Sequence, residues 1–251
     1  MSEELRSVLA TRYVAPLREG GSLPGLVEAD DDGLYVVKFR GAGQGLRALV
    51  AEVIAGELAR ALGLLVPDLV LAELDADLGR AEPDPEIQEL IEASTGTNLG
   101  VDFLPGALPF TPAGLATIDP ATAADVVWFD ALVTNVDRTP RNPNLLVWHG
   151  RTWLIDHGAA FYRQHGSEPL TATARAAFPL IREHVLIERA GPIARADARL
   201  ADRAAAAVDR AVGVVPPEWL GADARADFTS FLRSRLEPPR AFVEEAESGR
   251  P

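Results

Sequence analysis

The stretch from residue 130 to residue 161 reads DALVTNVDRTPRNPNLLVWHGRTWLIDHGAAF, and the rest of the chain is best interpreted from it. It opens with an apolar run and continues into a loop rich in Asp, Arg, Pro and Asn. Two short β-type runs follow, at residues 145–148 and 152–155, with His149 and Gly150 near their junction. This pattern predicts a β-hairpin that ends directly before Asp156.

The hairpin would bring three oxygen-bearing side chains together: Asp137 and Asn142 from the loop before it, and Asp156 from its end. A carboxylate and a carboxamide are suitable ligands for Mg²⁺, which keeps several waters and takes further ligands from substrate phosphates. We therefore expect Asn142 and Asp156 to bind a metal and Asp137 to orient or deprotonate a hydroxyl group. Asx and Pro also form plain surface turns, so only the combination of the three points to a site.

This set resembles the catalytic residues of kinases. In protein kinases a catalytic Asp is followed five positions later by a metal-binding Asn, and a second metal-binding Asp follows a hairpin. Asp137, Asn142 and Asp156 have that arrangement. The Asp-Arg pair and the ending Ile-Asp-His-Gly-Ala-Ala-Phe resemble the HipA-like and phosphatidylinositol 3/4-kinase branch more than ordinary protein kinases. The resemblance implies ATP and Mg²⁺ as cofactors.

The resemblance also implies an α+β, two-lobed protein-kinase-like fold. Residues 1–106 would form the N-lobe, a five-stranded antiparallel sheet with one main helix that binds the nucleotide. Residues 107–251 would form a mostly helical C-lobe with the catalytic loop and the metal-binding Asp. Hydrophobic patterns agree with this division: strands are predicted at 13–17, 24–29, 34–39, 69–74 and 99–104, and the main helix at 46–62, ending at Gly63.

Further helices are expected from capping signals and apolar periodicity. Asp119 and Pro120 predict the start of a helix that runs to about Thr134 and leads into the catalytic loop. The other predicted helices cover residues 85–93, 182–190, 196–212, 223–236 and 239–247.

Lys38 is the only lysine among the 24 basic residues of the chain. It lies at the end of a predicted strand, where a kinase has the lysine that reaches the α- and β-phosphates of ATP. The resemblance implies this role for Lys38 and implies that Glu52, in the following helix, holds its ammonium group. Glu57 is a second acidic residue of that helix. The alternative for Lys38 is an exposed lysine on a strand, and the alternative for Glu52 and Glu57 is a solvated helix face.

The phosphate loop is the weakest part of the resemblance, since residues 20–25 read GGSLPG and not Gly-x-Gly-x-x-Gly. Backbone amides of Gly20, Gly21 and Ser22 could cradle a phosphate, but a plain hairpin turn accounts for the same residues. Arg138 has two interpretations as well, either stabilising the transferred phosphoryl group or pairing within the loop. His157 replaces the Phe of Asp-Phe-Gly and is expected to be a packed residue.

Composition argues against several other classes of protein. The chain has 251 residues, no cysteine and a net charge of -13, which argues against thiolate chemistry and against broad binding to nucleic acid or anionic membranes. The N-terminus lacks the pattern of a signal peptide, and no long uncharged apolar run occurs. We therefore expect a cytoplasmic protein.

The sequence thus predicts an ATP- and Mg-dependent kinase that transfers the γ-phosphoryl group to a hydroxyl acceptor. HipA-like relatives imply a protein Ser or Thr, while a small-molecule alcohol also fits the acidic surface. Two alternatives keep the fold: a catalytically inactive nucleotide-binding regulator, and a nucleotidyl transferase that adds AMP.

Overall fold

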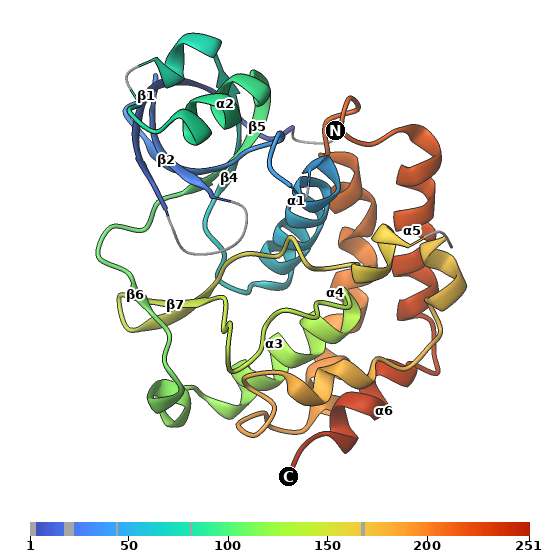
Figure 1. Ribbon diagram of the computed structural model, residues 1–251. Helices are drawn as coiled ribbons and strands as arrows, with labels where there is room; N and C mark the ends of the chain where they lie inside the picture. Colours follow the sequence, from blue (N-terminus) through green and yellow to red (C-terminus); the bar gives the residue numbers. More distant parts are fainter. Residues whose placement is uncertain (1–3, 18–22, 44, 81, 167–168) are drawn as a thin grey trace. The chain divides into compact units, whose positions relative to one another are not determined.

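The computed structural model describes residues 4–17, 23–43, 45–80, 82–166 and 169–251 (Figure 1). The chain divides into two compact units. Unit 1 comprises Met1–Val50 and Pro67–Pro105, and unit 2 comprises Ala51–Val66 and Gly106–Pro251. Residues 51–66, which we assigned to the first lobe, thus belong to unit 2. The reason is visible in their hydrogen bonds, because Leu65 O accepts the Leu154 amide at 2.8 Å within that unit.

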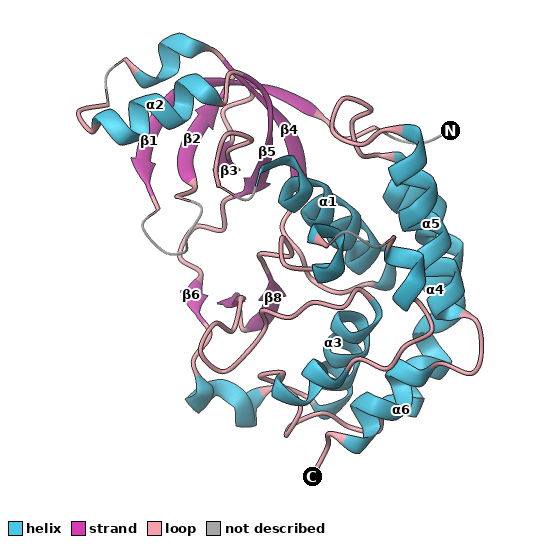
Figure 2. Ribbon diagram, turned by 45° about the vertical axis from the view of Figure 1, so that its right-hand side comes forward, coloured by secondary structure: helices cyan, strands magenta, loops and turns pink. Residues whose placement is uncertain are grey.

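Unit 1 is built on a closed five-stranded barrel with the order β1-β2-β3-β5-β4 (Figure 2). All five predicted strands are present, but the purely antiparallel sheet was wrong, because β1 pairs in parallel with β4 and closes the barrel. β1 begins at Ser7, earlier than predicted, and two register shifts bend it so that it pairs with both β2 and β4. The strands are β1 Ser7–Pro16, β2 Gly25–Ala29, β3 Leu34–Lys38, β4 Leu69–Leu74 and β5 Gly96–Asp102.

Alternation along β3 determines which side chains enter the core of unit 1. Tyr35 and Val37 are buried, whereas Lys38 is only partly buried and stands opposite Leu99 of β5. The core is completed by Ile87 and Ile91, which lie on the predicted short helix, α2 Pro85–Ala93. A 3-10 helix, η1 Ala76–Gly79, precedes α2.

Helix α3 Pro120–Leu132 is the central helix of unit 2 and contacts α4, α5 and α6. It begins as predicted, with the Asp119 carboxylate accepting the Thr122 amide at 3.0 Å. Trp128 is wholly buried, and its ring meets Phe242 of α6 edge-on at 5.7 Å. This burial gives the loop after α3 a fixed base. The three helices that α3 contacts are α4 Ile193–Gly213, α5 Ala222–Leu236 and α6 Ala241–Ser248. Helix α1 Gly45–Leu62 is divided between the two units, with Ala51–Leu62 in unit 2.

The predicted hairpin is confirmed as β7 Leu145–Trp148 and β8 Arg151–Leu154, with Leu145 opposite Leu154. Its two turn residues have positive φ, 48° at His149 and 69° at Gly150, as a type I′ turn requires. A third strand was not predicted, because β6 Leu108–Pro109 has only two residues. The remaining 3-10 helices of unit 2 are η2 Pro112–Thr117, η3 Tyr162–His165, η4 Leu170–Thr173 and η5 Pro179–Glu183.

The predicted helix at residues 182–190 is wrong. Only η5 forms there, and His184 has extended backbone, with φ -65° and ψ 134°. Tertiary bonds take the backbone donors that a helix needs: Val185 N donates to Arg138 O, and Leu186 N donates to the ring of His184, each at 3.0 Å. The side chain of His184 is buried by these contacts.

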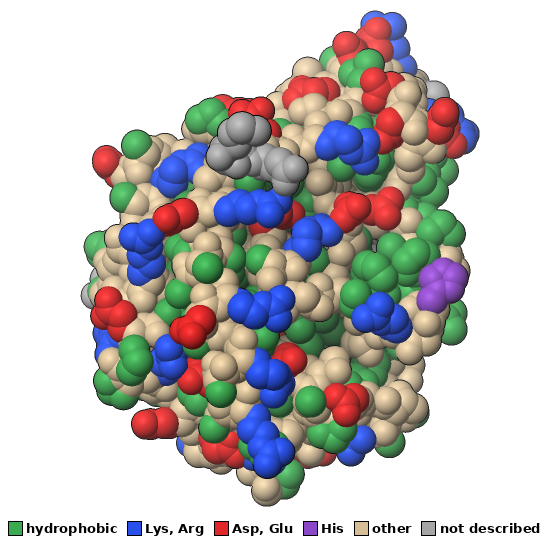
Figure 3. Space-filling view, turned by 180° about the vertical axis from the view of Figure 1, so that it is seen from behind, with side chains coloured by type: hydrophobic (Ala, Val, Ile, Leu, Met, Phe, Trp, Pro, Cys, Tyr) green, Lys and Arg blue, Asp and Glu red, His purple; other side chains and the backbone are tan. Residues whose placement is uncertain are grey.

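The face shown in Figure 3 carries arginine and acidic side chains interspersed with one another, without a continuous field of one sign. Among the described residues, no helix combines the length and the apolar character that crossing a bilayer requires.

Candidate active site

Asp137 lies on the loop that leaves the buried end of α3. The chain turns out of the helix at Thr134, whose φ is 51°, and the Asn135 amide returns to Asp130 O at 2.9 Å. The side chain of Asn135 then accepts the backbone amide of Asp137 at 3.1 Å. These local bonds fix the backbone at Asp137, which is partly buried.

Two asparagine amides hold the carboxylate of Asp137. Asn142 Nδ2 donates to Asp137 Oδ2 at 2.7 Å, and Asn144 Nδ2 donates to the same oxygen at 3.2 Å. The structure therefore brings together Asp137 and Asn142, as their spacing predicted. Asn144 is a site residue that sequence reasoning missed, although the signal was present in Asn-Pro-Asn directly before β7.

Asp156 stands directly after the hairpin and acts on Asp137 through its charge. Burial raises the pKa of Asp137 above its usual value, and the negative charge of Asp156 raises it further. Hydrogen bonds from Asn144 and Asn142 oppose these two effects. Asp137 and Asn142 are thus joined by a hydrogen bond, and the negative charge of Asp156 acts on the same carboxylate. A cation would relieve repulsion between the two carboxylates. A shared metal site of Asn142 and Asp156 stays a prediction.

No group of three or more His, Asp and Glu suited to a metal is found in the part of the chain that the structure describes. A Mg²⁺ ion needs no such group, because it is commonly bound by one or two carboxylates together with substrate phosphates. Asn142 and Asp156 fit this requirement. The Nδ2 group of Asn142 is directed to Asp137, so its Oδ1 is the atom suited to a cation.

Backbone strain is concentrated in this segment. Thr134, Asn144, Asp156 and Phe161 all have positive φ, between 47° and 55°. Asn and Asp tolerate this conformation better than other residues, whereas Thr and Phe rarely adopt it. Such residues cost on the order of 1–3 kcal/mol each and cluster at functional sites.

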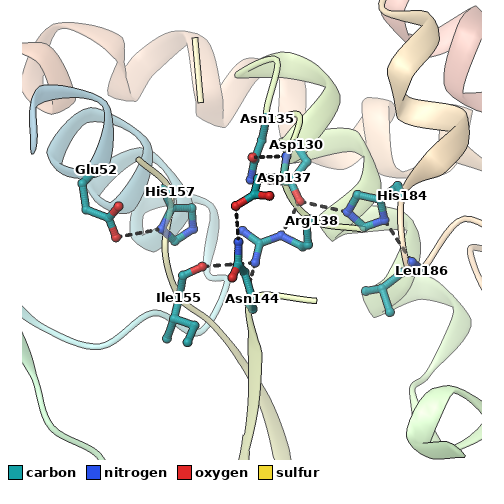
Figure 4. Close-up of polar contacts among 10 residues, drawn as sticks. All are labelled: Glu52, Asp130, Asn135, Asp137, Arg138, Asn144, Ile155, His157, His184 and Leu186. Carbon is teal, nitrogen blue, oxygen red and sulfur yellow. Dashed lines mark hydrogen bonds and ion pairs between the residues drawn. The ribbon is translucent and has the colours of Figure 1, made fainter. Parts of the chain in front are cut away.

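A buried polar cluster lies beside the loop that carries Asp137 (Figure 4). Asp130 accepts Arg138 Nε at 2.5 Å, His184 Nε2 at 2.9 Å and Asn135 Nδ2 at 3.0 Å. Arg138 is 1% exposed. Of its two interpretations, pairing within the loop is therefore the one that its contacts support. Sequence reasoning missed Asp130 and His184, which lie 54 positions apart.

Charges in this cluster are balanced by the ion pair between Asp130 and Arg138. Burial alone would raise the pKa of Asp130, but the charge of Arg138 and the hydrogen bonds from His184 and Arg138 lower it well below its usual range. Burial lowers the pKa of His184, so this histidine is neutral at pH 7. Asp130 and Arg138 therefore form a buried ion pair beside a neutral imidazole.

Glu52 and His157 form a buried pair in unit 2, and His157 directly follows Asp156 in the sequence. Glu52, on α1, is 2% exposed, and its Oε1 lies 3.8 Å from Nδ1 of His157. His157 is buried as expected, with its ring edge-on to Phe129 at 5.9 Å. Lys38 is on β3 of unit 1. Its partnership with Glu52 stays a prediction.

The proposed phosphate-loop residues Gly20, Gly21 and Ser22 lie outside the described residues. Their role in holding a phosphate stays a prediction.

A solved structure and a protein family match this chain. A search among curated proteins gave no match. The chain is similar to the proinflammatory kinase CtkA of Helicobacter pylori, with 12% identity over 97% of each chain and a TM-score of 0.62. At this identity the likeness shows the fold alone. The model of the HipA-like kinase family matches residues 11–237, and the chain therefore belongs to the HipA-like kinase family.

Proposed function

We propose that this protein is an ATP- and Mg-dependent kinase that transfers the γ-phosphoryl group to a hydroxyl acceptor, with a protein Ser or Thr as the acceptor class. One observation carries the proposal: the Asp137 carboxylate is fixed by Asn142 and Asn144 while the charge of Asp156 acts on it. A fixed carboxylate beside a site suited to a cation is what positioning of a nucleophile requires.

In the proposed reaction, Asp137 orients the acceptor hydroxyl and receives its proton. A bond forms between the acceptor oxygen and the γ-phosphorus, the bond from phosphorus to the β–γ bridging oxygen breaks, and ADP leaves. The side-chain amides of Asn142 and Asn144 both donate hydrogen bonds to Oδ2 of Asp137. Neither of them binds Oδ1, which is therefore the oxygen suited to receive the proton. The raised pKa of Asp137, caused mainly by burial, makes the carboxylate a better proton acceptor.

Asn142 and Asp156 would hold Mg²⁺, which when bound supplies positive charge to the phosphate oxygens. Lys38 would contact the α- and β-phosphates, since an ammonium group acts on phosphate as a compact point charge. Glu52 would orient Lys38, and Gly20, Gly21 and Ser22 would cradle phosphate through their amides. These assignments follow from the family's motif and are supported by the grouping of Asp137, Asn142 and Asp156.

The proposed class of acceptor is based on the family of the chain and on its net charge. Membership of the HipA-like kinase family supports a protein hydroxyl, and a net charge of -13 favours a basic protein segment over an anionic lipid headgroup. Intact-mass spectrometry after incubation with Mg-ATP and a Ser/Thr peptide library tests this. Added phosphate supports the kinase, added AMP supports a nucleotidyl transferase, and no addition supports an inactive regulator.

Binding is tested separately by thermal unfolding. Mg-ATP should raise the unfolding temperature, whereas ATP with a chelator should raise it much less, because phosphate charge then faces Asp137 and Asp156 without a cation. Lys38→Ala should weaken the Mg-ATP effect. Arg80→Ala, which removes an exposed cation of unit 1, is the control and should leave the effect intact. An equal response of both variants to Mg-ATP would remove Lys38 from the site.

A further inference from the structure

Hydrogen bonding fixes the tautomer of His184. Its Nδ1 accepts the backbone amide of Leu186 at 3.0 Å, so this nitrogen carries no proton. The ring proton is therefore on Nε2, which lies 2.9 Å from Asp130 Oδ2 and donates to it. Burial keeps the ring neutral by lowering its pKa. His184 thus acts on Asp130 as an oriented hydrogen-bond donor.

Asp130 reaches the catalytic loop by a first route, through Asn135. The Nδ2 group of Asn135 donates to Asp130 Oδ1, and its Oδ1 accepts the backbone amide of Asp137. The two roles fix the orientation of the amide, because one neighbour can only accept and the other can only donate. One side chain therefore separates Asp130 from the backbone of Asp137.

A second route runs through Arg138. Its Nε donates to Asp130, and its Nη1 donates to the carbonyls of Asn144 and Ile155, the latter at 3.3 Å. Asn144 is the residue whose amide holds Asp137, and Ile155 directly precedes Asp156. The Asp130 carboxylate thus fixes Asp137 in two ways (Figure 4). Through Asn135 it holds the backbone amide of Asp137, and through Arg138 it holds Asn144, whose side chain binds the Asp137 carboxylate.

We infer that Asp130 and His184 are positioning residues for the transfer reaction, with His184 holding the Asp130 carboxylate in the orientation that Asn135 and Arg138 need. This inference rests on the proposed kinase activity. In the proposed reaction, neither Asp130 nor His184 contacts the substrate. Their loss lowers turnover by displacing Asp137, without weakening nucleotide binding.

Histidine replacements give the sharper test, because Asp130→Asn would leave the buried charge of Arg138 without a carboxylate. His184→Gln places a donor near the position of Nε2 and so keeps the bond to Asp130. His184→Asn places an acceptor near Nδ1 for the Leu186 amide and loses the bond to Asp130. The control is His149→Asn, which changes an exposed histidine whose φ of 48° suits asparagine.

Steady-state transfer of labelled γ-phosphate to a Ser/Thr peptide library should separate these variants. We expect kcat to fall about 10-fold or more in His184→Asn, with KM for ATP unchanged, and to stay within about 3-fold of wild type in His184→Gln and His149→Asn. Mg-ATP should raise the unfolding temperature of all of them equally.

Two results would overturn the inference in an active wild-type protein. One is an unchanged kcat in folded His184→Asn, and the other is a kcat in folded His184→Gln that falls about 10-fold. If His184→Asn does not fold, the Gln variant decides alone. A wild-type protein that binds Mg-ATP and labels no acceptor contradicts the proposed function instead, so the two failures are distinguishable.

Discussion

At the scale of single residues, Asp137 is defined by how its two oxygens differ. Oδ2 accepts both asparagine amides, and Oδ1 is the atom assigned to the acceptor's proton. Asp137→Asn keeps the shape of the side chain and removes the proton acceptor. We predict that turnover falls by about 100-fold or more, while Mg-ATP still raises the unfolding temperature.

Asp32→Asn is the matched control for that prediction. Asp32 is an exposed turn residue with φ 61°, a conformation that asparagine tolerates. Its variant should turn over like wild type. Equal turnover of Asp137→Asn and Asp32→Asn in γ-phosphate transfer assays would remove Asp137 from the reaction.

His184 predicts how stability depends on pH. Burial lowers its pKa in the folded state from 6.5, so below about pH 6.5 the unfolded chain binds a proton that the folded chain does not. The contribution of the neutral His184 to the free energy of unfolding should therefore be fully present above this pH. It should decrease as the pH drops toward the folded-state pKa. Asp130 loses its stabilising effect only at lower pH, because its own pKa is depressed below 3.8.

Thermal unfolding between about pH 7.5 and about pH 5 checks this expectation. The unfolding temperature should decrease more over this interval in wild type than in His184→Gln, which has no imidazole at that position. Both proteins keep the other three histidines, so the difference isolates His184. Parallel curves for the two proteins would show that the folded pKa of His184 is not lowered.

At the scale of elements, local chemistry set the ends of the helices that were predicted well. Gly63 follows α1 with φ 83°, and the bonds from Gly63 N to Arg60 O and from Leu64 N to Ala59 O form a Schellman motif. The His-Gly turn of the hairpin has the same origin, since positive φ at both residues matches the twist of the strands.

Gly63 and Gly213 should respond oppositely to the same substitution. Gly63→Ala puts a Cβ on a residue with φ 83° and should lower the free energy of unfolding by roughly 1 kcal/mol. Gly213 is the last residue of α4, and a Cβ there would meet nothing within 4 Å. Gly213→Ala should raise the free energy of unfolding by roughly 0.5 kcal/mol. Urea denaturation measures both changes, and the same sign for both would contradict the capping argument.

At the scale of the whole molecule, long-range contacts hold unit 2 together, and Arg235 makes several of them. Arg235 is 2% exposed and lies on α5. It donates to Ala131 O at 2.8 Å, to Ala174 O at 3.2 Å and to Ala176 O at 2.9 Å. Its guanidinium also lies 4.8 Å from the Phe242 ring centroid. Burial lowers its pKa to about 10.

We predict that Arg235→Met lowers the free energy of unfolding by about 3 kcal/mol, because it leaves buried carbonyls without donors. Arg235→Lys should recover only part of this, since an ammonium group lacks the planar fork that reaches several carbonyls. Arg233→Met, on the same helix but with a 58% exposed side chain, should cost less than about 1 kcal/mol. Similar urea midpoints for Arg235→Met and Arg233→Met would contradict this role of Arg235.

The sequence by itself determined the parts of this protein that depend on neighbours along the chain. The hairpin before Asp156, the spacing of Asp137 and Asn142, the caps of α1 and α3 and the five strands of unit 1 were all readable there. Each depends on residues a few positions apart, whose backbone preferences and alternation act locally.

Only the tertiary structure decided the rest. It closed the strands of unit 1 into a barrel through the parallel pairing of β1 and β4. Where a helix was predicted at residues 182–190, it formed the end of η5 and a loop in which His184–Ile187 are buried. His184 reaches Asp130 across 54 positions, and Arg235 reaches Ala131 across 104. Such contacts leave no local signal, because a buried donor and its acceptor find each other only after the surrounding chain has packed.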